Sequence, residues 1–276
     1  MRLAISRAAL ENLLFEDAPL GDLTTDLLLP PGLTGQMIFA ARGAMVAALV
    51  EEAACLLELA GAQVDIHAAS GARLTPGAKI LTARGPASAL LRGWKVAQTL
   101  IEIWSGVATG AAEIVAAAEG AAVACTRKNT PGAKTFAVAA VCAGGAAMHR
   151  LGLSETILVF PEHRAFLGDE SLESQARRLR RAAPEKKLVI EVNSIAEAEA
   201  AARAGFDVVQ AEKLTPAAIA AIADFFRTLP HPPVLAAAGG ITAANAARFA
   251  RAGAQVLVTS APYLAPPRDV AVTIST

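Results

Sequence analysis

The stretch from residue 188 to residue 240, LVIEVNSIAEAEAAARAGFDVVQAEKLTPAAIAAIADFFRTLPHPPVLAAAGG, contains three short apolar runs separated by two helical segments. Because the runs LVIEV (188–192), VVQAE (208–212) and VLAAA (234–238) show almost no polar alternation, each is expected to be a strand buried on both faces. Residues 196–204 and 216–229 lie between them and have the periodicity of amphipathic helices. This stretch therefore predicts a parallel sheet covered by helices.

The same rhythm continues on both sides of this stretch. Apolar runs of strand type also occur at residues 121–126, 156–160 and 256–260, and helical segments occur at residues 173–183 and 243–252. Six such units in a row favour an α/β fold with a closed or nearly closed, TIM-like βα barrel of about six parallel strands, which we assign to residues 111–265. An open doubly wound sheet is the alternative, because periodicity alone does not separate the two folds.

The first 110 residues lack this βα rhythm and are expected to form a separate module of mixed helices and strands. The predicted helices cover residues 3–14, 51–60 and 87–118, the second ended by Gly61 and the third broken near Ser105-Gly106, and residues 16–26 are polar and turn-rich. The predicted strands cover residues 36–41, 44–50, 64–68, 72–74 and 79–83.

Composition excludes several classes of protein. Hydrophobic residues make up 54% of the chain and charged residues 18%, which excludes a disordered protein. Because 25 basic residues balance 25 acidic ones, no global field attracts nucleic acid or an anionic membrane, and any anionic partner should be small. The longest apolar stretch, residues 136–148, is shorter than the ~20 residues of a membrane span.

Cysteine usage points to a reducing compartment. Cys55, Cys125 and Cys142 are scattered and form no CxxC pair, so we expect reduced thiols rather than disulfides or a zinc site. The first residues lack the continuous apolar core and the cleavage site of a signal peptide. The cytoplasm is therefore the expected location.

Charged and glycine-rich segments follow the predicted strands, at the end where parallel α/β folds bind ligands. Gly239-Gly240 would let an oxyanion approach free backbone N–H groups, and hydroxyls from Thr259 and Ser260 would add to that phosphate site. Glu191 lies inside an apolar run, so it is either a structural partner for a cation or a ligand for Mg²⁺ or ribose hydroxyls. The basic and acidic residues at or near these ends are Arg127, Lys128, Glu191 and Glu212, and the segment before the strand at 156–160 adds His149 and Arg150.

This combination suggests transfer of a phosphorylated sugar to a second, anionic substrate. Carboxylates stabilise the oxocarbenium-like transition state of glycosyl transfer, while Mg²⁺ and cationic side chains hold the leaving pyrophosphate. Such a step depends on positioning and electrostatics more than on a covalent nucleophile. An aldolase or isomerase that uses a Schiff-base lysine is disfavoured, because none of the six strand cores contains a lysine.

The motifs resemble those of the quinolinate phosphoribosyltransferase (nicotinate-nucleotide pyrophosphorylase) family over nearly the whole chain. Several of them resemble more closely the ModD branch, whose members are associated with molybdenum-transport genes. The family motifs are GDLTT (21–25), SGVAT (105–109), TRK (126–128), HRLGL (149–153), EV (191–192) and GGI (239–241); those of the branch are GWK (93–95), HRLGLSETILVF (149–160), EHR (162–164), AAAGGI (236–241) and LVTSAPY (257–263).

The resemblance implies an N-terminal α/β sandwich, an open βα barrel and a homodimer or higher oligomer in which subunits share active sites. It also implies that the chain end after about residue 265 rejoins the first module, and that Mg²⁺ and phosphoribosyl pyrophosphate are required. In the implied roles, Lys128, Glu191 and Glu212 are catalytic, the two glutamates face ribose and Mg²⁺, and the 5′-phosphate lies on Gly239, Gly240, Thr259 and Ser260. The implied acceptor pocket comprises Lys95, which would come from the neighbouring subunit, with Arg127, His149, Arg150 and Phe160.

The chain departs from the family pattern at four places. Lys95 replaces an arginine, Phe160 replaces a lysine, Ala211-Glu212-Lys213 replaces Leu-Asp-Asn, and Ala238 replaces a serine. Losing a pocket lysine to phenylalanine removes one anion partner, so we expect a heteroaromatic acid other than quinolinate, such as a monocarboxylate, as the acceptor. The alternative is a non-catalytic binding protein linked to molybdate handling.

Overall fold

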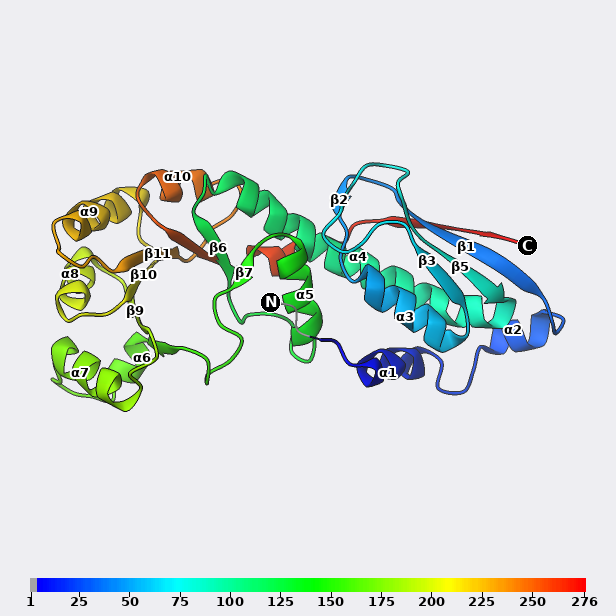
Figure 1. Cartoon of the computed structure of the whole chain (residues 1–276), viewed down its shortest axis with the longest axis horizontal. Coiled ribbons are helices and arrows are strands. Elements are labelled where there is room, and N and C mark those ends of the chain that lie inside the picture. Colours follow the sequence, from blue (N-terminus) through cyan, green and yellow to red (C-terminus); the bar gives the residue numbers. More distant parts are fainter. Residues whose placement is uncertain (1–3) are drawn as a thin grey trace. The chain divides into compact units, whose positions relative to one another are not determined.

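The computed structural model describes residues 4–276, so the first residue of the helix predicted at 3–14 lies outside the described part. The chain divides into two compact units. The first unit comprises the chain up to Ala112 together with Asn129–Gly145 and Pro262–Thr276. The second unit comprises Glu113–Lys128 and Ala146–Ala261. Figure 1 shows both units and labels most of their elements.

The second unit is built on one sheet of seven strands in the order β7-β6-β12-β11-β10-β9-β8, with every neighbouring pair parallel. Since the two edge strands β7 and β8 do not pair, the barrel is open, which confirms the predicted fold class. Six strands coincide with the predicted runs, and the two-residue β7 is additional. The strands are β6 (Ala122–Cys125), β7 (Ala147–Met148), β8 (Ile157–Val159), β9 (Leu188–Val192), β10 (Val208–Glu212), β11 (Val234–Ala238) and β12 (Val256–Thr259).

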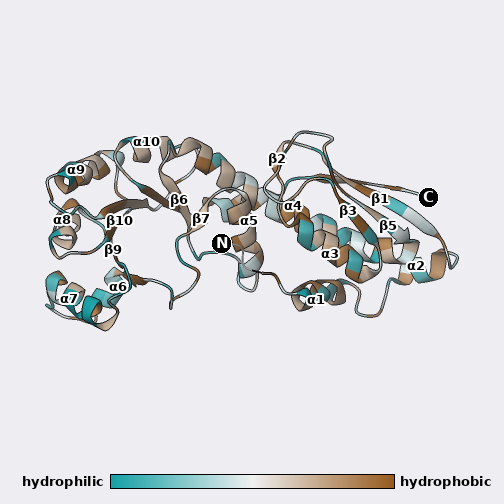
Figure 2. Cartoon of the chain, viewed as in Figure 1, coloured by the Kyte–Doolittle hydropathy of each residue, from teal (hydrophilic) through white to brown (hydrophobic). Residues whose placement is uncertain are grey.

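Helices follow the strands of this sheet, as Figure 1 shows. Three of them begin at a hydroxyl residue, Ser171, Ser194 or Thr215, whose side chain accepts a hydrogen bond from the backbone N–H three residues later. The solvent-facing side of α7 is strongly polar, and this helix is largely teal in Figure 2. The helices are α6 (Pro161–Arg164), α7 (Leu172–Ala182), α8 (Ile195–Arg203), α9 (Pro216–Arg227) and α10 (Ala246–Arg251).

The first unit holds a four-stranded antiparallel sheet in the order β13-β1-β5-β3 and a two-stranded one, β2-β4. The C-terminal strand β13 pairs with β1, so the end of the chain belongs to the first unit. The strands are β1 (Thr34–Ala41), β2 (Met45–Val46), β3 (Gln63–Ile66), β4 (Arg73–Leu74), β5 (Lys79–Pro86) and β13 (Val270–Ser275). The helices are α1 (Arg7–Asp17), α2 (Leu23–Leu28), α3 (Val50–Ala60), α4 (Ala87–Ala117), α5 (Lys134–Ala143) and the 3-10 helix η1 (Ala261–Leu264).

Helix α4 runs without interruption through Ser105-Gly106, so the predicted break is wrong. Gly106 allows close packing: a Cβ there would lie 2.4 Å from the carbonyl oxygen of Pro266. The Ser105 hydroxyl accepts a hydrogen bond from the backbone N–H of Ala48 at 3.0 Å. Within the described residues α4 is the one helix that could cross a membrane by length and composition, but 56% of its most apolar window is buried, as in a core helix.

Candidate functional site

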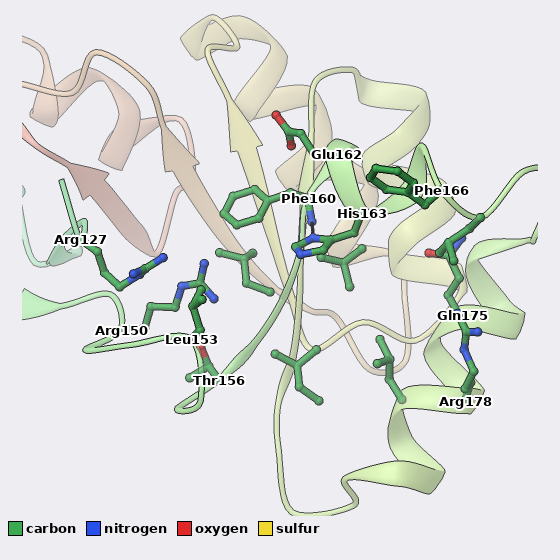
Figure 3. A pocket seen from close by; sticks show the side chains of 15 residues that line it. Arg127, Arg150, Leu153, Thr156, Phe160, Glu162, His163, Phe166, Gln175 and Arg178 are labelled. Carbon is green, nitrogen blue, oxygen red and sulfur yellow. Dashed lines mark hydrogen bonds between the residues drawn. The ribbon is translucent and has the colours of Figure 1, made fainter.

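Two loops bring cationic side chains to the carboxyl end of β6 and β7. Arg127 and Lys128 follow β6, and His149 and Arg150 follow β7. The His149 backbone N–H donates to the Cys125 carbonyl at 2.8 Å, which continues the pairing of the two strands and fixes the second loop against the first. Figure 3 shows the guanidinium groups of Arg127 and Arg150 approaching each other.

Arg150 is a buried cation, with 7% of its surface exposed. Its pKa is lowered, first by burial and then by the positive charge of Arg127. Among the described residues, no carboxylate forms an ion pair with Arg150 or Arg127. Burying an unpaired charge beside a like charge is costly, and a bound anion would relieve that cost. This arrangement therefore favours an anionic ligand.

Phe160 forms an aromatic wall beside these arginines. The Arg150 guanidinium carbon lies 5.4 Å from the centroid of the Phe160 ring. The ring also stacks on His163, with centroids 5.7 Å apart and an interplanar angle of 23°. His163 is held in place because its Nδ1 accepts the backbone N–H of Phe160 at 2.9 Å. A flat ring carrying a carboxylate fits a wall and two cations arranged in this way.

Two carboxylates lie on neighbouring strands of the sheet. Glu191 on β9 is half-buried and accepts a hydrogen bond at 2.7 Å from Nε2 of Gln210 on β10. Burial raises the pKa of Glu191, and the charge of Glu212 raises it further, while the Gln210 hydrogen bond and the Lys128 charge lower it. The charge of Lys128 therefore acts on Glu191. The structure thus brings together both acids and the cation predicted to be catalytic.

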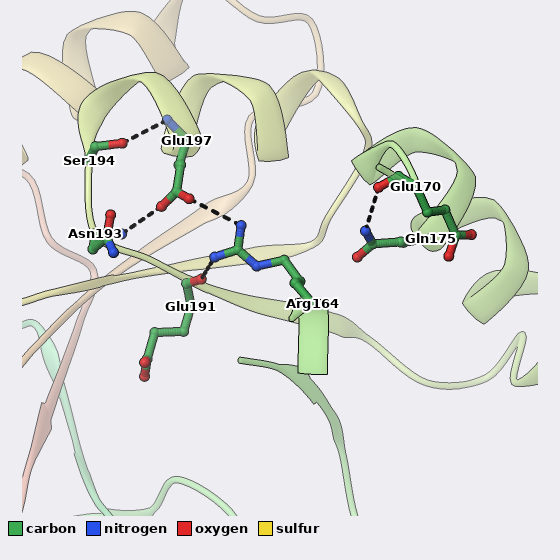
Figure 4. A network of polar contacts seen from close by, with 7 residues as sticks. All are labelled: Arg164, Glu170, Gln175, Glu191, Asn193, Ser194 and Glu197. Carbon is green, nitrogen blue, oxygen red and sulfur yellow. Dashed lines mark hydrogen bonds and ion pairs between the residues drawn. The ribbon is translucent and has the colours of Figure 1, made fainter. Parts of the chain in front are cut away.

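A polar network fixes the backbone at Glu191 (Figure 4). Arg164 donates to the Glu191 carbonyl at 3.4 Å and pairs with Glu197 at 3.1 Å. The other carboxylate oxygen of Glu197 accepts the backbone N–H of Asn193 at 3.0 Å. The side chain of Glu191 points away from this network in Figure 4, which leaves its carboxylate available to a ligand.

The carboxylates of Glu191 and Glu212 fit a magnesium ion that also binds a substrate phosphate. No group of three or more metal-ligating side chains is present among the described residues. Mg²⁺ is commonly bound through one or two carboxylates, several waters and substrate phosphates rather than by a complete protein cage. Since the charges of Glu191 and Glu212 repel each other, a cation between them would be favourable.

Gly239 and Gly240 form a turn with two consecutive positive φ angles, +87° and +75°. Asn245 holds the turn: its Nδ2 donates to the Gly240 carbonyl at 2.9 Å, and its Oδ1 accepts the Thr242 N–H at 2.8 Å. Within residues 4–276 the backbone N–H groups of Gly239, Gly240 and Ile241 donate no hydrogen bond. Consecutive free N–H groups of this kind make an anion-binding concavity. The turn is therefore suited to a phosphate.

Thr259 supports this turn, and its role as a phosphate ligand stays a prediction. Its buried hydroxyl donates to the Ile241 carbonyl at 2.7 Å and accepts the Ala261 N–H at 3.0 Å, so its only proton is in use. Ser260 stays a candidate phosphate ligand, because its hydroxyl shares a 2.6 Å hydrogen bond with that of Thr126 in which either can donate.

Lys213 is a candidate that the sequence analysis did not select. Its φ is +56°, a conformation that non-glycine residues adopt at a cost of ~1–2 kcal/mol. Its side chain crosses Gly239, where a Cβ would lie 2.5 Å from the Lys213 Cγ. This packing places a lysine next to the Gly239-Gly240 turn, called the phosphate turn below. Its position directly after a strand-end glutamate was the signal available in the sequence.

Replacing Gly239 by alanine should impair both stability and binding of the sugar phosphate. The new Cβ would lie 2.5 Å from the Lys213 Cγ and 2.9 Å from the Glu212 Oε1, at a φ of +87°. We expect a loss of ~1–3 kcal/mol in the free energy of unfolding, together with weaker binding of phosphoribosyl pyrophosphate in calorimetry. Gly240→Ala is the matched control, because its φ is also positive but no atom lies within 4 Å of its Cβ. Equal stability of the two variants would contradict this account.

His149 should make stability depend on pH. Burial lowers its pKa, and the charge of Arg150 lowers it further. The unfolded chain therefore binds a proton more readily than the folded protein, and the free energy of unfolding should fall as pH drops below the ordinary histidine value of ~6.5. Urea denaturation between pH 5 and pH 8 measures this, and His149→Gln should flatten the part of the profile that His149 causes. A decline that is unchanged in the variant would assign it to other groups.

Lys95 lies on α4 in the first unit and is distant in sequence from the strand ends described above. Its Nζ lies 4.2 Å from the Trp94 ring centroid and 3.1 Å from the Gln98 Oε1. Lys95 forms no ion pair with any described residue. Its charge is thus available to an anion, as its predicted role in a neighbouring subunit's site requires.

Comparison with known proteins matches both parts of the chain to domains of one protein family. Residues 22–105 match the family model "Quinolinate phosphoribosyl transferase, N-terminal domain", and residues 107–273 match the corresponding C-terminal domain. A Rhodobacter capsulatus protein described as "Putative pyrophosphorylase ModD" is 49% identical over 253 residues, 90% of this chain and 97% of that protein. A protein of the same description from Escherichia coli O6:H1 is 36% identical over 275 residues, 98% of this chain and 97% of the relative.

Solved structures agree with these matches. A crystal structure described as a NadC deletion mutant superposes with a TM-score of 0.90 at 25% sequence identity. The match covers 99% of this chain and 99% of that structure, so both units have counterparts in it.

Proposed function

Because the chain belongs to the quinolinate phosphoribosyl transferase family, we propose that it is an enzyme that transfers a phosphoribosyl group from phosphoribosyl pyrophosphate to a heteroaromatic acid, or catalyses the reverse reaction. The observation that carries the proposal is Arg150, a buried cation that faces Arg127 and has no carboxylate partner among the described residues. It lies on the same sheet end as two carboxylates and a phosphate turn. An anion beside an activated sugar accounts for all three features.

In the proposed reaction the bond between ribose C1 and the pyrophosphate oxygen breaks, and its electron pair leaves with pyrophosphate. The lone pair of the acceptor's ring nitrogen forms the new C1–N bond, so the ring acquires a positive charge and no proton is transferred. Glu191 and Glu212 stabilise the cationic ribose ring as the bond breaks. The backbone N–H groups of residues 239–241 and Ser260 hold the 5′-phosphate.

The acceptor lies between the arginines and the aromatic wall. Arg127 and Arg150 bind its carboxylate, Phe160 contacts the face of its ring, and His149, neutral at pH 7, contributes hydrogen bonds rather than charge. Lys128 lies near Glu191 and binds the leaving group. Bound Mg²⁺, held by Glu191 and Glu212 directly or through water, would neutralise charge on the pyrophosphate.

Release of pyrophosphate from phosphoribosyl pyrophosphate tests the proposal. The full chain is incubated with the donor, Mg²⁺ and a panel of heteroaromatic mono- and dicarboxylates. We expect release that depends on the acceptor, with a monocarboxylate preferred over quinolinate because Phe160 occupies the position of a family lysine. If no acid elicits release, the proposal fails, and calorimetry with molybdate then tests the alternative of a non-catalytic oxyanion-binding protein.

We also propose a homodimer, with Lys95 of one subunit completing the site of the other, and a cytoplasmic location that fits three cysteines that form no disulfide within the described residues. Exposed leucines support the dimer: Leu20, Leu23, Leu27 and Leu28, in and beside α2, are 97%, 73%, 80% and 72% exposed. Clustered apolar side chains of this kind mark protein–protein interfaces.

The double substitution Leu23→Glu and Leu27→Glu should therefore yield monomers and abolish pyrophosphate release, because each monomer would lack its partner's lysine. Light scattering coupled to size exclusion measures the mass. Leu264→Glu is the matched control, since Leu264 is 86% exposed at another place in the chain. A wild-type monomer, or a double variant that stays dimeric, would refute the assignment of this surface.

A further inference from the structure

The pocket next to Arg127 and Arg150 is larger than a single aromatic ring requires. It has a volume of about 970 Å³ and lies wholly within the second unit. Pockets of ~300–1,000 Å³ typically hold drug-sized ligands, so this volume is at the upper end of that range. The two arginines line one part of the pocket, and the rest extends past Phe160 along β8 towards α7, as Figure 3 shows.

The extension beyond Phe160 is mainly apolar. Its walls come from the edge strand β8, from the segment after α6 and from α7, and the aliphatic residues among them are Ile157, Leu158, Leu167 and Leu179. Phe166 lies on the rim with 90% of its surface exposed, and Leu153 with 73%. Large apolar side chains this exposed indicate a contact surface for a ligand or partner. Their continuity with the cationic part favours a ligand that occupies both.

The far end of the pocket contains an unsatisfied hydrogen-bond acceptor. Gln175 lines the pocket and is only 4% exposed. Its Nε2 donates to the Glu170 carbonyl at 2.8 Å, whereas its Oε1 has no hydrogen-bond partner among the described residues. A buried acceptor without a partner is unfavourable. The oxygen is itself shielded, so a ligand would bond to it only after the pocket wall rearranges.

We propose that the acceptor is an elongated heteroaromatic monocarboxylate, with a second ring or aryl substituent that fills the apolar extension between β8 and α7. This inference rests on the proposed function and specifies its acceptor class. The carboxylate binds Arg127 and Arg150, the first ring contacts Phe160, and the apolar part covers Ile157 and Leu179.

Direct binding measurements test the proposal without relying on turnover. The probes are pyridine-3-carboxylate, quinoline-3-carboxylate and 6-phenylpyridine-3-carboxylate, titrated calorimetrically into the full chain. We expect at least one of the two extended acids to bind ten-fold or more tightly than the single ring, because burial of additional apolar surface adds affinity. Equal affinity for all three probes would overturn the proposal.

Filling the extension gives the second arm of the test. Leu179→Trp should remove the advantage of the extended acids and leave pyridine-3-carboxylate binding within about two-fold of wild type. Arg177→Trp, on the exposed face of the same helix and outside the pocket lining, is the matched control and should retain the advantage. Phe166→Ala provides a variant at an exposed rim position, and we expect about a three-fold loss for the extended acids only. If Leu179→Trp and Phe166→Ala both keep the wild-type preference, the proposal is wrong.

The outcomes separate this inference from the proposed function. Tight binding of an extended acid without pyrophosphate release would retain the pocket assignment and refute transfer. Pyrophosphate release with single-ring acids, together with no preference for extended ones, would retain transfer and refute the extended acceptor.

Discussion

Glu191→Gln should reduce the rate of pyrophosphate release by about 100- to 1,000-fold, the effect typical of removing one group that stabilises transition-state charge. The substitution preserves the size of the side chain and allows the hydrogen bond from Gln210 Nε2, which is 2.7 Å long in the wild type. The amide has no charge with which to stabilise a cationic ribose ring. Steady-state kinetics with saturating donor measures the loss.

The same substitution should increase stability, which a purely structural role for Glu191 does not predict. Burial and the Glu212 charge raise the pKa of Glu191, so the folded protein binds its proton more tightly than the unfolded chain does. Protonated Glu191 therefore stabilises the folded protein at low pH, and this contribution is lost as pH rises through its raised folded-state pKa. At pH 7 the ionised Glu191 side chain is unfavourable in the folded protein. Urea denaturation of both proteins should therefore show a more stable variant at pH 7 and a smaller difference at pH 4. A variant that is both active and less stable would contradict this assignment.

Arg150→Met should have the second largest effect, a loss of about 100-fold or more in kcat/KM for the acceptor, because truncating a buried charge that pairs with a ligand costs ~2–5 kcal/mol. KM for phosphoribosyl pyrophosphate should change much less, since the proposed site of its 5′-phosphate is at residues 239–241. Folding should be preserved, because methionine replaces a buried cation that has no carboxylate partner among the described residues.

Arg177→Met, at an exposed position on α7, controls for the loss of one positive charge. We expect it to leave both kcat/KM and thermal stability near wild type. If Arg150→Met retained acceptor binding, the anion would have to bind elsewhere on the chain, and the arginine pair would lose its assigned role.

Local sequence patterns predicted the strands of the second unit well, whereas the strand predicted at 44–50 covers only Met45–Val46 and the one predicted helix interruption is absent. Each of the six apolar runs became a strand. A strand buried on both faces of a parallel sheet has a short, continuously apolar sequence, which is the pattern these runs show. The two-residue β7 is too short to produce a pattern. The predicted break at Ser105-Gly106 failed because Gly106 serves close packing against Pro266, a contact between residues far apart in sequence. Tertiary packing of this kind overrides local propensity.

The candidate site was predictable as a set of residues but not as a set of interactions. The sequence identified Arg127 directly after one predicted strand and Glu191 near the end of another, where strand ends of a parallel sheet converge. Arg150 was selected from the segment before the strand at 156–160, because β7 was not predicted. The hydrogen bond from the Thr259 hydroxyl to the Ile241 carbonyl joins residues 18 positions apart, so no local sequence pattern predicts it. The left-handed conformation of Lys213 could not be predicted from the sequence either, because a lysine rarely adopts a φ of +56°.

A crystal structure of the full chain with phosphoribosyl pyrophosphate, Mg²⁺ and a heteroaromatic acid that does not react tests the central claim most directly. We predict density for the 5′-phosphate at the backbone N–H groups of residues 239–241 and for the acid's carboxylate between Arg127 and Arg150. The ribose C1 should face Glu191 and Glu212. Either ligand bound on another face, or a carboxylate that avoids both arginines, would contradict the account.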